Sequence, residues 1–334
     1  MINYIIILIL VILFLILYRK YEMKQDPDYS IIRKYLIRGK DINSFKPILW
    51  IYLPSEPNSR RIKNFGDGHS TALNQDYLFL TIKSIIMAND TSFTICIIDN
   101  KSFNKILPGW EYDLSRIAPP ISCHLVQLAL AKTLYQYGGI LVPPSFLCFR
   151  NLIDMYNYGT SDNKVFICEN INKSITCSSH EFTTDTTFMG CLPESKLMLE
   201  YIKFCEIIIS TDTTQNPQFS GVFNDWFYRK KGVTIINGKR IGTKTKSYKK
   251  VAIEDLFSEF YIPFSKEAYG IYIPNKEIIE MIKYEWFSRL SKKEVLSGNT
   301  TIQKMILLTS RESSGWISFW KLPSGFGSFK PVSF

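Results

Sequence analysis

The hydrophobic pattern of this chain begins with one long apolar run. Tyr4 to Tyr18 is uninterrupted apolar or aromatic sequence, and the first basic residues, Arg19 and Lys20, follow it directly. The run is near the short end of the roughly 17–25 residues that a membrane helix needs. A cleaved signal peptide would carry basic residues before the run and a small-residue cleavage site after it. We therefore expect residues 1–18 to form an uncleaved transmembrane anchor. The alternative is a buried N-terminal helix, although a helix that is apolar on every face suits lipid better.

The flanks of this run predict its orientation. Positive charge follows the apolar run and does not precede it. Because basic residues stay preferentially on the cytosolic side, we expect a single-pass protein whose large C-terminal part faces the cytosol. Residues 19–45 are polar and contain Pro27, which is typical of a juxtamembrane linker. We expect residues 46–334 to form the folded part.

Beyond the linker, apolar runs of strand length alternate with segments of helical periodicity. In the helical segment 74–89, for example, Leu78, Ile82, Ile85 and Ile86 share one face. Such alternation predicts an α/β fold, with a mostly parallel sheet and helices on its faces. The predicted strands are 46–52, 93–100, 140–142, 165–169 and 182–191, and the main predicted helices are 74–89, 127–137 and 195–209.

The most distinctive stretch runs from Ser122 to Leu152. An apolar helix leads into Tyr137-Gly138-Gly139, and a short apolar strand at 140–142 follows. The turn after this strand reads Pro143-Pro144-Ser145 and contains no carboxylate.

This stretch resembles the glycosyltransferases with a DXD sugar-binding region, the capsular-polysaccharide and mannosyltransferase-like group with a GT-A (Rossmann-like) fold. Their local pattern is roughly S-D-x-x-R-x-x-x-L-y-x-y-G-G-i-Y-l-D-x-D. The residues that match are Leu134, Tyr135, Tyr137, Gly138, Gly139 and Ile140. The residues that depart from it are Gln127 and Leu130, in place of the first Asp and the Arg, and Pro143 and Ser145, in place of the two metal-linked Asp residues. Weaker agreement extends over roughly Lys46 to Phe227.

The departures at the turn bear on metal chemistry. A divalent cation that neutralises the diphosphate of a sugar nucleotide prefers oxygen ligands, chiefly carboxylates. Proline offers no side-chain ligand and no backbone N–H, and serine offers only a neutral oxygen. We therefore expect no metal cofactor at Pro143–Ser145, and interpret these residues as a stiff turn after a buried strand.

Several residues are candidates for substrate binding. In open α/β sheets, ligands bind beyond the carboxyl ends of the strands. Tyr52 and Asp99 end two predicted strands there, although Asp99 is the better candidate for a helix cap. The resemblance adds the remaining candidates: Gln127, Gly138, Gly139, Ser145 and, by a loose match to a residue that faces the donor sugar, Asp185.

The net charge of +10 changes the picture only locally. Basic residues gather between Arg229 and Lys250. They indicate either a solvated hairpin, a patch for anionic lipid headgroups, or a patch for a polyanionic partner. No recognition motif accompanies this charge, so we expect no nucleic-acid partner. The cysteine and histidine spacings do not predict a zinc site.

Three functions stay open at this point. The chain could be a glycosyltransferase-like protein that has lost its chemistry and binds a glycan or nucleotide, or builds an assembly at a membrane. It could be an active, metal-independent transferase that uses a sugar-nucleotide donor. It could also be an unrelated structural membrane protein. For the second function, the candidate basic residues for replacing a cation are Arg60, Arg61, Lys63, Arg116 and Lys132.

Overall fold

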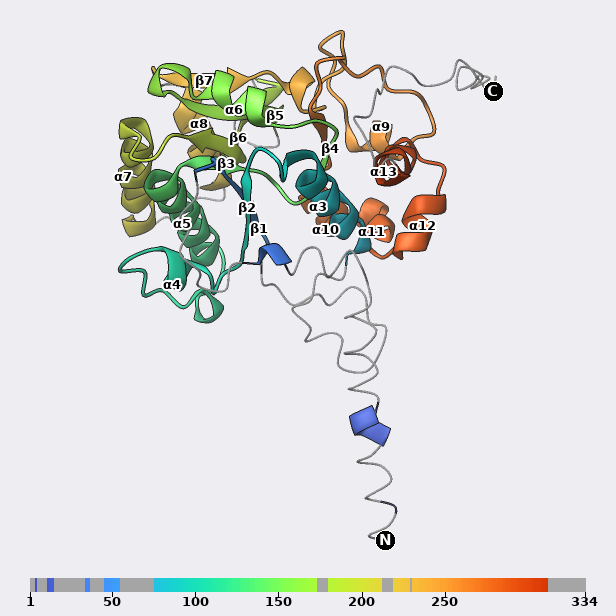
Figure 1. Ribbon diagram of the computed structural model, residues 1–334, viewed down its shortest axis with the longest axis horizontal. Helices are drawn as coiled ribbons and strands as arrows, with labels where there is room; N and C mark the ends of the chain where they lie inside the picture. The colour runs from blue at the N-terminus through green and yellow to red at the C-terminus, as the bar shows by residue number, and fades with distance from the viewer. Residues whose placement is uncertain are drawn as a thin grey trace.

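The computed structural model describes residues 4, 11–14, 34–36, 45–54, 75–172, 180–211, 219–228 and 230–311. Within these residues the fold is mixed α/β, built on a six-stranded sheet with the strand order β2-β1-β3-β6-β5-β7 (Figure 1). The strands are β1 (Ile48–Tyr52), β2 (Thr94–Ile98), β3 (Gly139–Leu141), β5 (Val165–Ile171), β6 (Phe182–Cys191) and β7 (Val233–Ile236).

The sheet is mostly parallel. β1 pairs in parallel with β2 and β3, and β5 pairs in parallel with β7. β6 runs antiparallel to both of its neighbours, β3 and β5. The first residues of β6 therefore lie at the edge where the other strands end.

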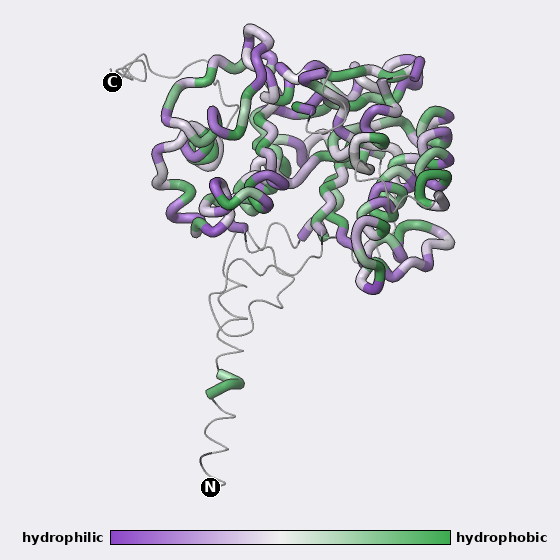
Figure 2. The backbone as a smooth tube through the Cα atoms, turned by 180° about the vertical axis from the view of Figure 1, so that it is seen from behind, coloured by the Kyte–Doolittle hydropathy of each residue, from purple (hydrophilic) through white to green (hydrophobic). Residues whose placement is uncertain are grey.

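Helices cover both faces of this sheet because the strand residues alternate between two apolar cores. Trp50 of β1 packs with α4 (Phe103–Ile106), α5 (Ile121–Tyr137), α7 (Lys196–Ser210) and α8 (Phe219–Tyr228). Its neighbours Leu49 and Ile51 pack with α3 (Asp76–Asn89) and α6 (Ile153–Gly159) on the opposite face. Figure 2 shows hydrophobic and hydrophilic stretches alternating along these helices, as expected for elements with one buried face.

A second, smaller unit lies against the outer side of α3. Its two-stranded antiparallel sheet joins β4 (Phe146–Cys148) to β8 (Gly270–Tyr272). Its helices are α9 (Ile253–Phe257), α10 (Asn275–Glu280), α11 (Ile282–Ser288), α12 (Lys292–Ser297) and α13 (Thr301–Arg311). A third apolar cluster, which includes Tyr77 and Leu80 of α3, joins these helices to α3 (Figure 1).

The expected α/β architecture, with a mostly parallel sheet flanked by helices, is confirmed. Among the residues that the structure describes, no helix is long and apolar enough to cross a membrane. The anchor expected over residues 1–18 lies outside the described residues except at Tyr4 and 11–14.

Candidate functional site

The turn after β3 is tied to two other parts of the chain. The backbone oxygen of Pro144 accepts a hydrogen bond of 2.6 Å from the Thr81 hydroxyl of α3. The Ser145 hydroxyl donates a hydrogen bond of 2.8 Å to the backbone oxygen of Ile273, just after β8. Ser145 is only 3% exposed. Pro143–Ser145 is therefore a junction between the main sheet, α3 and the smaller unit.

This arrangement leaves little ligand chemistry at the turn. The proton of the Ser145 hydroxyl is engaged by the Ile273 carbonyl, and the two prolines contribute no side-chain donor or ligand. Within the described ranges, no three His, Cys, Asp or Glu side chains are grouped so that they could hold a metal ion.

Gly138 follows α5 directly and Gly139 begins β3, so the strand separates both glycines from the turn. Both have positive φ angles, 64° and 100°. A Cβ atom on Gly139 would lie 2.1 Å from the backbone oxygen of Ile48, and one on Gly138 would lie 2.5 Å from Pro193. The Gly138 carbonyl also accepts a 2.9 Å hydrogen bond from the Trp50 indole. The glycines allow close packing of backbone against backbone.

Tyr52 and Asp99 lie at the ends of β1 and β2, as expected. The Tyr52 hydroxyl donates a 2.5 Å hydrogen bond to the side-chain oxygen of Asn100. The Asp99 carboxylate accepts hydrogen bonds from the backbone N–H and hydroxyl of Ser102, at 2.9 and 2.6 Å. Asp99 therefore caps the turn that leads into α4.

Gln127 joins two helices. Its side-chain nitrogen donates a 3.1 Å hydrogen bond to the hydroxyl of Tyr201, which belongs to α7. Burial raises the pKa of Tyr201 well above its usual value, so this phenol stays protonated. The hydrogen bond between Gln127 and Tyr201 therefore connects α5 to α7.

Asp185 lies in the first half of β6, at the edge where β5 ends. Its carboxylate accepts hydrogen bonds from the Asn170 amide at 2.7 Å and from the backbone N–H and hydroxyl of Thr187 at 2.9 and 2.6 Å. The Asn170 side chain also interacts with the Tyr272 phenol of β8, and both residues line the same cavity. The pKa of Tyr272 is raised, mainly by burial and then by the charge of Asp185.

Asp185, Asn170 and Tyr272 thus form a polar chain from β6 through β5 to β8. The sequence identified only Asp185 as a site candidate. The sequence alone gave no signal that singled out Tyr272 or Asn170. The chain of polar residues ends at a cavity of about 190 Å³ that Asn170 and Tyr272 help to line.

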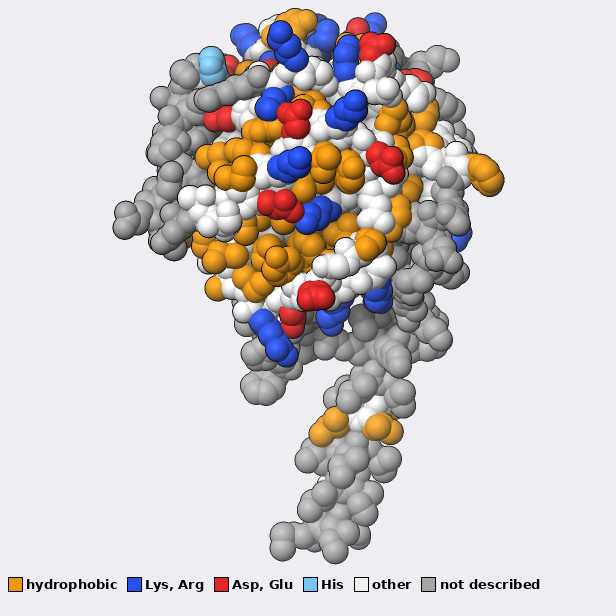
Figure 3. Space-filling view, turned by 90° about the vertical axis from the view of Figure 1, so that its left-hand side faces the viewer, with side chains coloured by type: hydrophobic (Ala, Val, Ile, Leu, Met, Phe, Trp, Pro, Cys, Tyr) orange, Lys and Arg blue, Asp and Glu red, His pale blue; other side chains and the backbone are white. Residues whose placement is uncertain are grey.

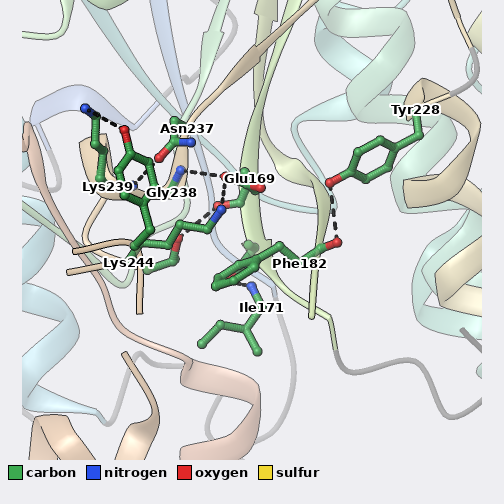
Figure 4. A network of polar contacts seen from close by, with 11 residues as sticks. Glu169, Ile171, Phe182, Tyr228, Asn237, Gly238, Lys239 and Lys244 are labelled. Atoms are coloured by element: carbon green, nitrogen blue, oxygen red, sulfur yellow. Dashed lines mark hydrogen bonds and ion pairs between the residues drawn. The ribbon is translucent and has the colours of Figure 1, made fainter. Parts of the chain in front are cut away.

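A buried ion pair fixes the segment beside this cavity (Figure 4). Lys244 lies 2.8 Å from the Glu169 carboxylate at the end of β5, and its side chain is 10% exposed. Glu169 also accepts a 3.0 Å hydrogen bond from the backbone N–H of Gly238. Lys244 belongs to the basic cluster at 229–250, but its ammonium group is engaged inside the fold by Glu169.

Other basic residues of the cluster also meet carboxylates. Lys239 lies 3.7 Å from Glu267, and Lys250 lies 3.8 Å from Glu181. Figure 3 shows basic, acidic and hydrophobic side chains intermixed on the face that carries α7.

The basic residues considered as substitutes for a cation are engaged elsewhere where the structure describes them. Lys132 of α5 pairs with Glu206 of α7 at 2.8 Å. Arg116 pairs with Asp113 at 3.1 Å, and its side chain is 85% exposed. Arg60, Arg61 and Lys63 lie outside the described residues.

Comparison with known proteins adds little to this site. No family model and no curated protein matches the chain. Among solved structures, 4-diphosphocytidyl-2C-methyl-D-erythritol synthase from Anaerococcus prevotii is similar at 12% identity, with a TM-score of 0.28, over 62% of this chain and 92% of that one. At this TM-score the likeness carries no conclusion about function.

Proposed function

We propose that this chain is a glycosyltransferase-like protein of the GT-A type that binds a glycan or a nucleotide without metal-dependent sugar transfer. The observation that carries this proposal is the position of Ser145. A serine occupies the position at which the glycosyltransferases that this chain resembles have a metal-linked aspartate. The Ser145 hydroxyl is buried and donates a hydrogen bond to the Ile273 carbonyl.

The sheet supports the transferase-like part of the proposal. Pro143 follows β3 closely, and β3 pairs in parallel with β1. Turns at the carboxyl ends of parallel strands are where ligands bind in open α/β sheets. This position of the turn supports the resemblance that the residues around Gly138-Gly139 suggest.

The basic residues considered as replacements for a cation support loss of the usual transfer chemistry. Departure of a nucleoside diphosphate needs positive charge at the leaving oxygens. Lys132 and Arg116 are paired with Glu206 and Asp113, so they are not arranged to replace the missing cation. The membrane tether at residues 1–18, the cytosolic orientation and a lipid contact of the 229–250 cluster belong to the same proposal.

The test uses the full chain in detergent and a panel of UDP-, GDP- and CMP-sugars, with and without Mn²⁺. Binding of one ligand should raise the melting temperature equally with and without the metal. At a ligand concentration of 100 times Kd, linkage predicts about 2.7 kcal/mol of added stability. No free nucleotide should be released during incubation. A shift that requires Mn²⁺, or release of nucleotide with transfer of its sugar, would overturn the proposal.

A pair of variants localises the binding. Asp185→Asn should reduce the thermal shift, because it removes the charge at the end of the polar chain formed with Asn170 and Tyr272. The matched control is Asp162→Asn, because the Asp162 side chain is 79% exposed and lies in the separate turn after α6. Equal shifts in both variants would place the ligand elsewhere.

A further inference from the structure

Helix α11 of the smaller unit exposes apolar side chains to solvent. Ile282 is 91% exposed, and Trp286, one helical turn later, is 41% exposed. Residues at i and i+4 lie on the same face of a helix, so these two side chains are neighbours. Met281, which directly precedes α11, is exposed as well. We call Met281, Ile282 and Trp286 the α11 strip.

The α11 strip is separate from the apolar surface that holds α11 in the fold. Tyr284 and Phe287 of the same helix are buried in the third apolar cluster. The ring of Trp286 packs against Phe257 of α9 and against Phe287, with ring centroids 5.3 and 5.7 Å apart. One part of the indole is therefore fixed by the fold, and the rest faces solvent. An aromatic ring held in this way is typical of side chains at the interface between lipid and water.

The charges beside the α11 strip are balanced. The Lys283 ammonium lies 3.8 Å from the Glu254 carboxylate, and the Arg289 guanidinium lies 2.5 Å from the Glu285 carboxylate. The surroundings therefore present no excess of one charge to a partner. A contact made by this strip should depend on its apolar side chains, and salt should weaken it little.

The N-terminal apolar run lies on the same side of the molecule. The structure describes residues 11–14 of this run, and their side chains are 48–67% exposed, so they are not packed into the fold. Figure 1 shows residues 11–14 beyond the end of the fold that carries α10, α11 and α12. A bilayer that surrounds the run would therefore lie toward the end of the fold at which the α11 strip is exposed.

We infer that the α11 strip rests on the surface of the phospholipid bilayer that holds the N-terminal run. The inference rests on the proposed function, because the membrane tether at residues 1–18 belongs to that proposal. A strip this short binds a membrane weakly by itself, since binding strength scales with the buried apolar area. A tether keeps the strip at a high effective concentration beside the lipid, so a weak contact is sufficient. The contact fixes the orientation of the folded part on the membrane.

The α11 strip and the basic cluster at 229–250 are alternatives for the lipid contact. The cluster includes β7, which Figure 1 shows at the opposite end of the fold from α11. One flat bilayer cannot contact both surfaces. A contact through the cluster would need anionic lipid and would weaken as salt is added. A contact through the α11 strip should form on neutral lipid and should persist in salt.

The experiment measures tryptophan fluorescence of the full chain in vesicles of dibrominated phosphatidylcholine, a neutral lipid whose bromine atoms quench an indole at short range. The chain has six tryptophans, so the emission of one of them is obtained as the difference between wild type and a variant. The emission that is lost in Trp286→Phe should be quenched by the brominated lipid. The matched control is Trp226→Phe, because Trp226 is another partly buried tryptophan and belongs to α8. The emission lost in Trp226→Phe should not be quenched.

A second pair of variants tests the strip itself. Ile282→Asp places a charge on the strip at a side chain that is almost fully exposed, so the fold should be kept and the quenching of Trp286 should be lost. Ile207→Asp is the matched control, because Ile207 is an exposed isoleucine of α7. It should leave the quenching unchanged. Urea unfolding in detergent should show wild-type stability for both variants.

Flotation of the vesicles separates this inference from the proposed function. A chain that does not float with the vesicles overturns the inference together with the membrane tether of the proposed function. A chain that floats while the Trp286 emission stays unquenched overturns the inference alone, and a smaller oligomer in Ile282→Asp would then assign the strip to a second copy of the chain. Quenching that needs phosphatidylserine, or that added salt removes, also overturns the inference and favours the basic cluster. The thermal shifts with nucleotide sugars test the ligand part of the proposed function independently of these outcomes.

Discussion

The turn after β3 and the cavity beside β5 and β8 belong to the same fold, yet their polar side chains differ in exposure to solvent. At the turn, the Ser145 hydroxyl and the Pro144 carbonyl are both bonded to other parts of the protein. At the cavity, Glu254 and Lys250 are also paired, with Lys283 and Glu181, but their side chains stay 56% and 48% exposed. The comparison teaches that a position beyond the end of a strand does not by itself make a binding site. A binding site also needs polar groups that face a cavity.

The largest effect should come from returning carboxylates to the turn. In the double variant Pro143→Asp with Ser145→Asp, a charge replaces a side chain that is 3% exposed. An unpaired buried charge costs about 3–5 kcal/mol. Urea unfolding of the full chain should show this loss with or without Mn²⁺. Recovery of wild-type stability on addition of Mn²⁺ would show that the turn keeps the geometry of a metal site and would contradict the account of it as a closed junction.

A smaller loss should follow from Gly139→Ala at the start of β3. The added Cβ would lie 2.1 Å from the Ile48 carbonyl oxygen at a residue with φ of 100°. Overpacking and backbone strain together should cost about 3 kcal/mol in the free energy of unfolding. Gly109→Ala is the control, because Gly109 has φ of 71° and nothing within 4 Å of the added atom. It should cost about 1 kcal/mol, and equal losses would contradict the steric account.

Ser145→Ala tests whether the turn is structural alone. It removes the hydrogen bond to the Ile273 carbonyl, so we expect a loss of about 1–2 kcal/mol in urea unfolding. Sugar and nucleotide affinities should stay at their wild-type values. A change in either affinity without loss of stability would return Ser145 to the binding site.

The smallest effect concerns pH at the cavity. The hydrogen bond from Tyr284 lowers the pKa of Glu254 below its usual value of 4.5, so its contribution to stability is present above that pH. The contribution is lost as the pH falls through the lowered pKa. Tyr284→Phe should therefore destabilise the chain by about 0.2–1 kcal/mol at pH 7, the range of an exposed charged contact. Thermal unfolding should show that the difference between the variant and the wild type shrinks below pH 4.

The strands and helices of the main sheet could be predicted because their signals are local. Apolar runs predict β1 and β2, and the periodic spacing of Leu78 and Ile82 predicts α3. The antiparallel direction of β6 depends on which strands it pairs with, and the pattern of its own residues does not reveal this. The pairing of β4 with β8 joins distant segments and has no local signal either.

The same distinction applies to the candidate site and to the smaller unit. Tyr52 and Asp99 could be identified because each ends a predicted strand. Asn170 could not, because its role depends on contacts with Asp185 and Tyr272 from other strands. Helix α12 did carry a local signal, since Ser291 and Glu294 form the capping box that starts it.

The claim that the turn is closed to metal is tested most directly by the electron paramagnetic resonance signal of free Mn²⁺. The signal would be compared for UDP alone and for UDP with the full chain in detergent. The account predicts equal signals, because Ser145 is engaged by Ile273 and the prolines supply no side-chain ligand. A loss of one Mn²⁺ per chain that Ser145→Ala abolishes would contradict it.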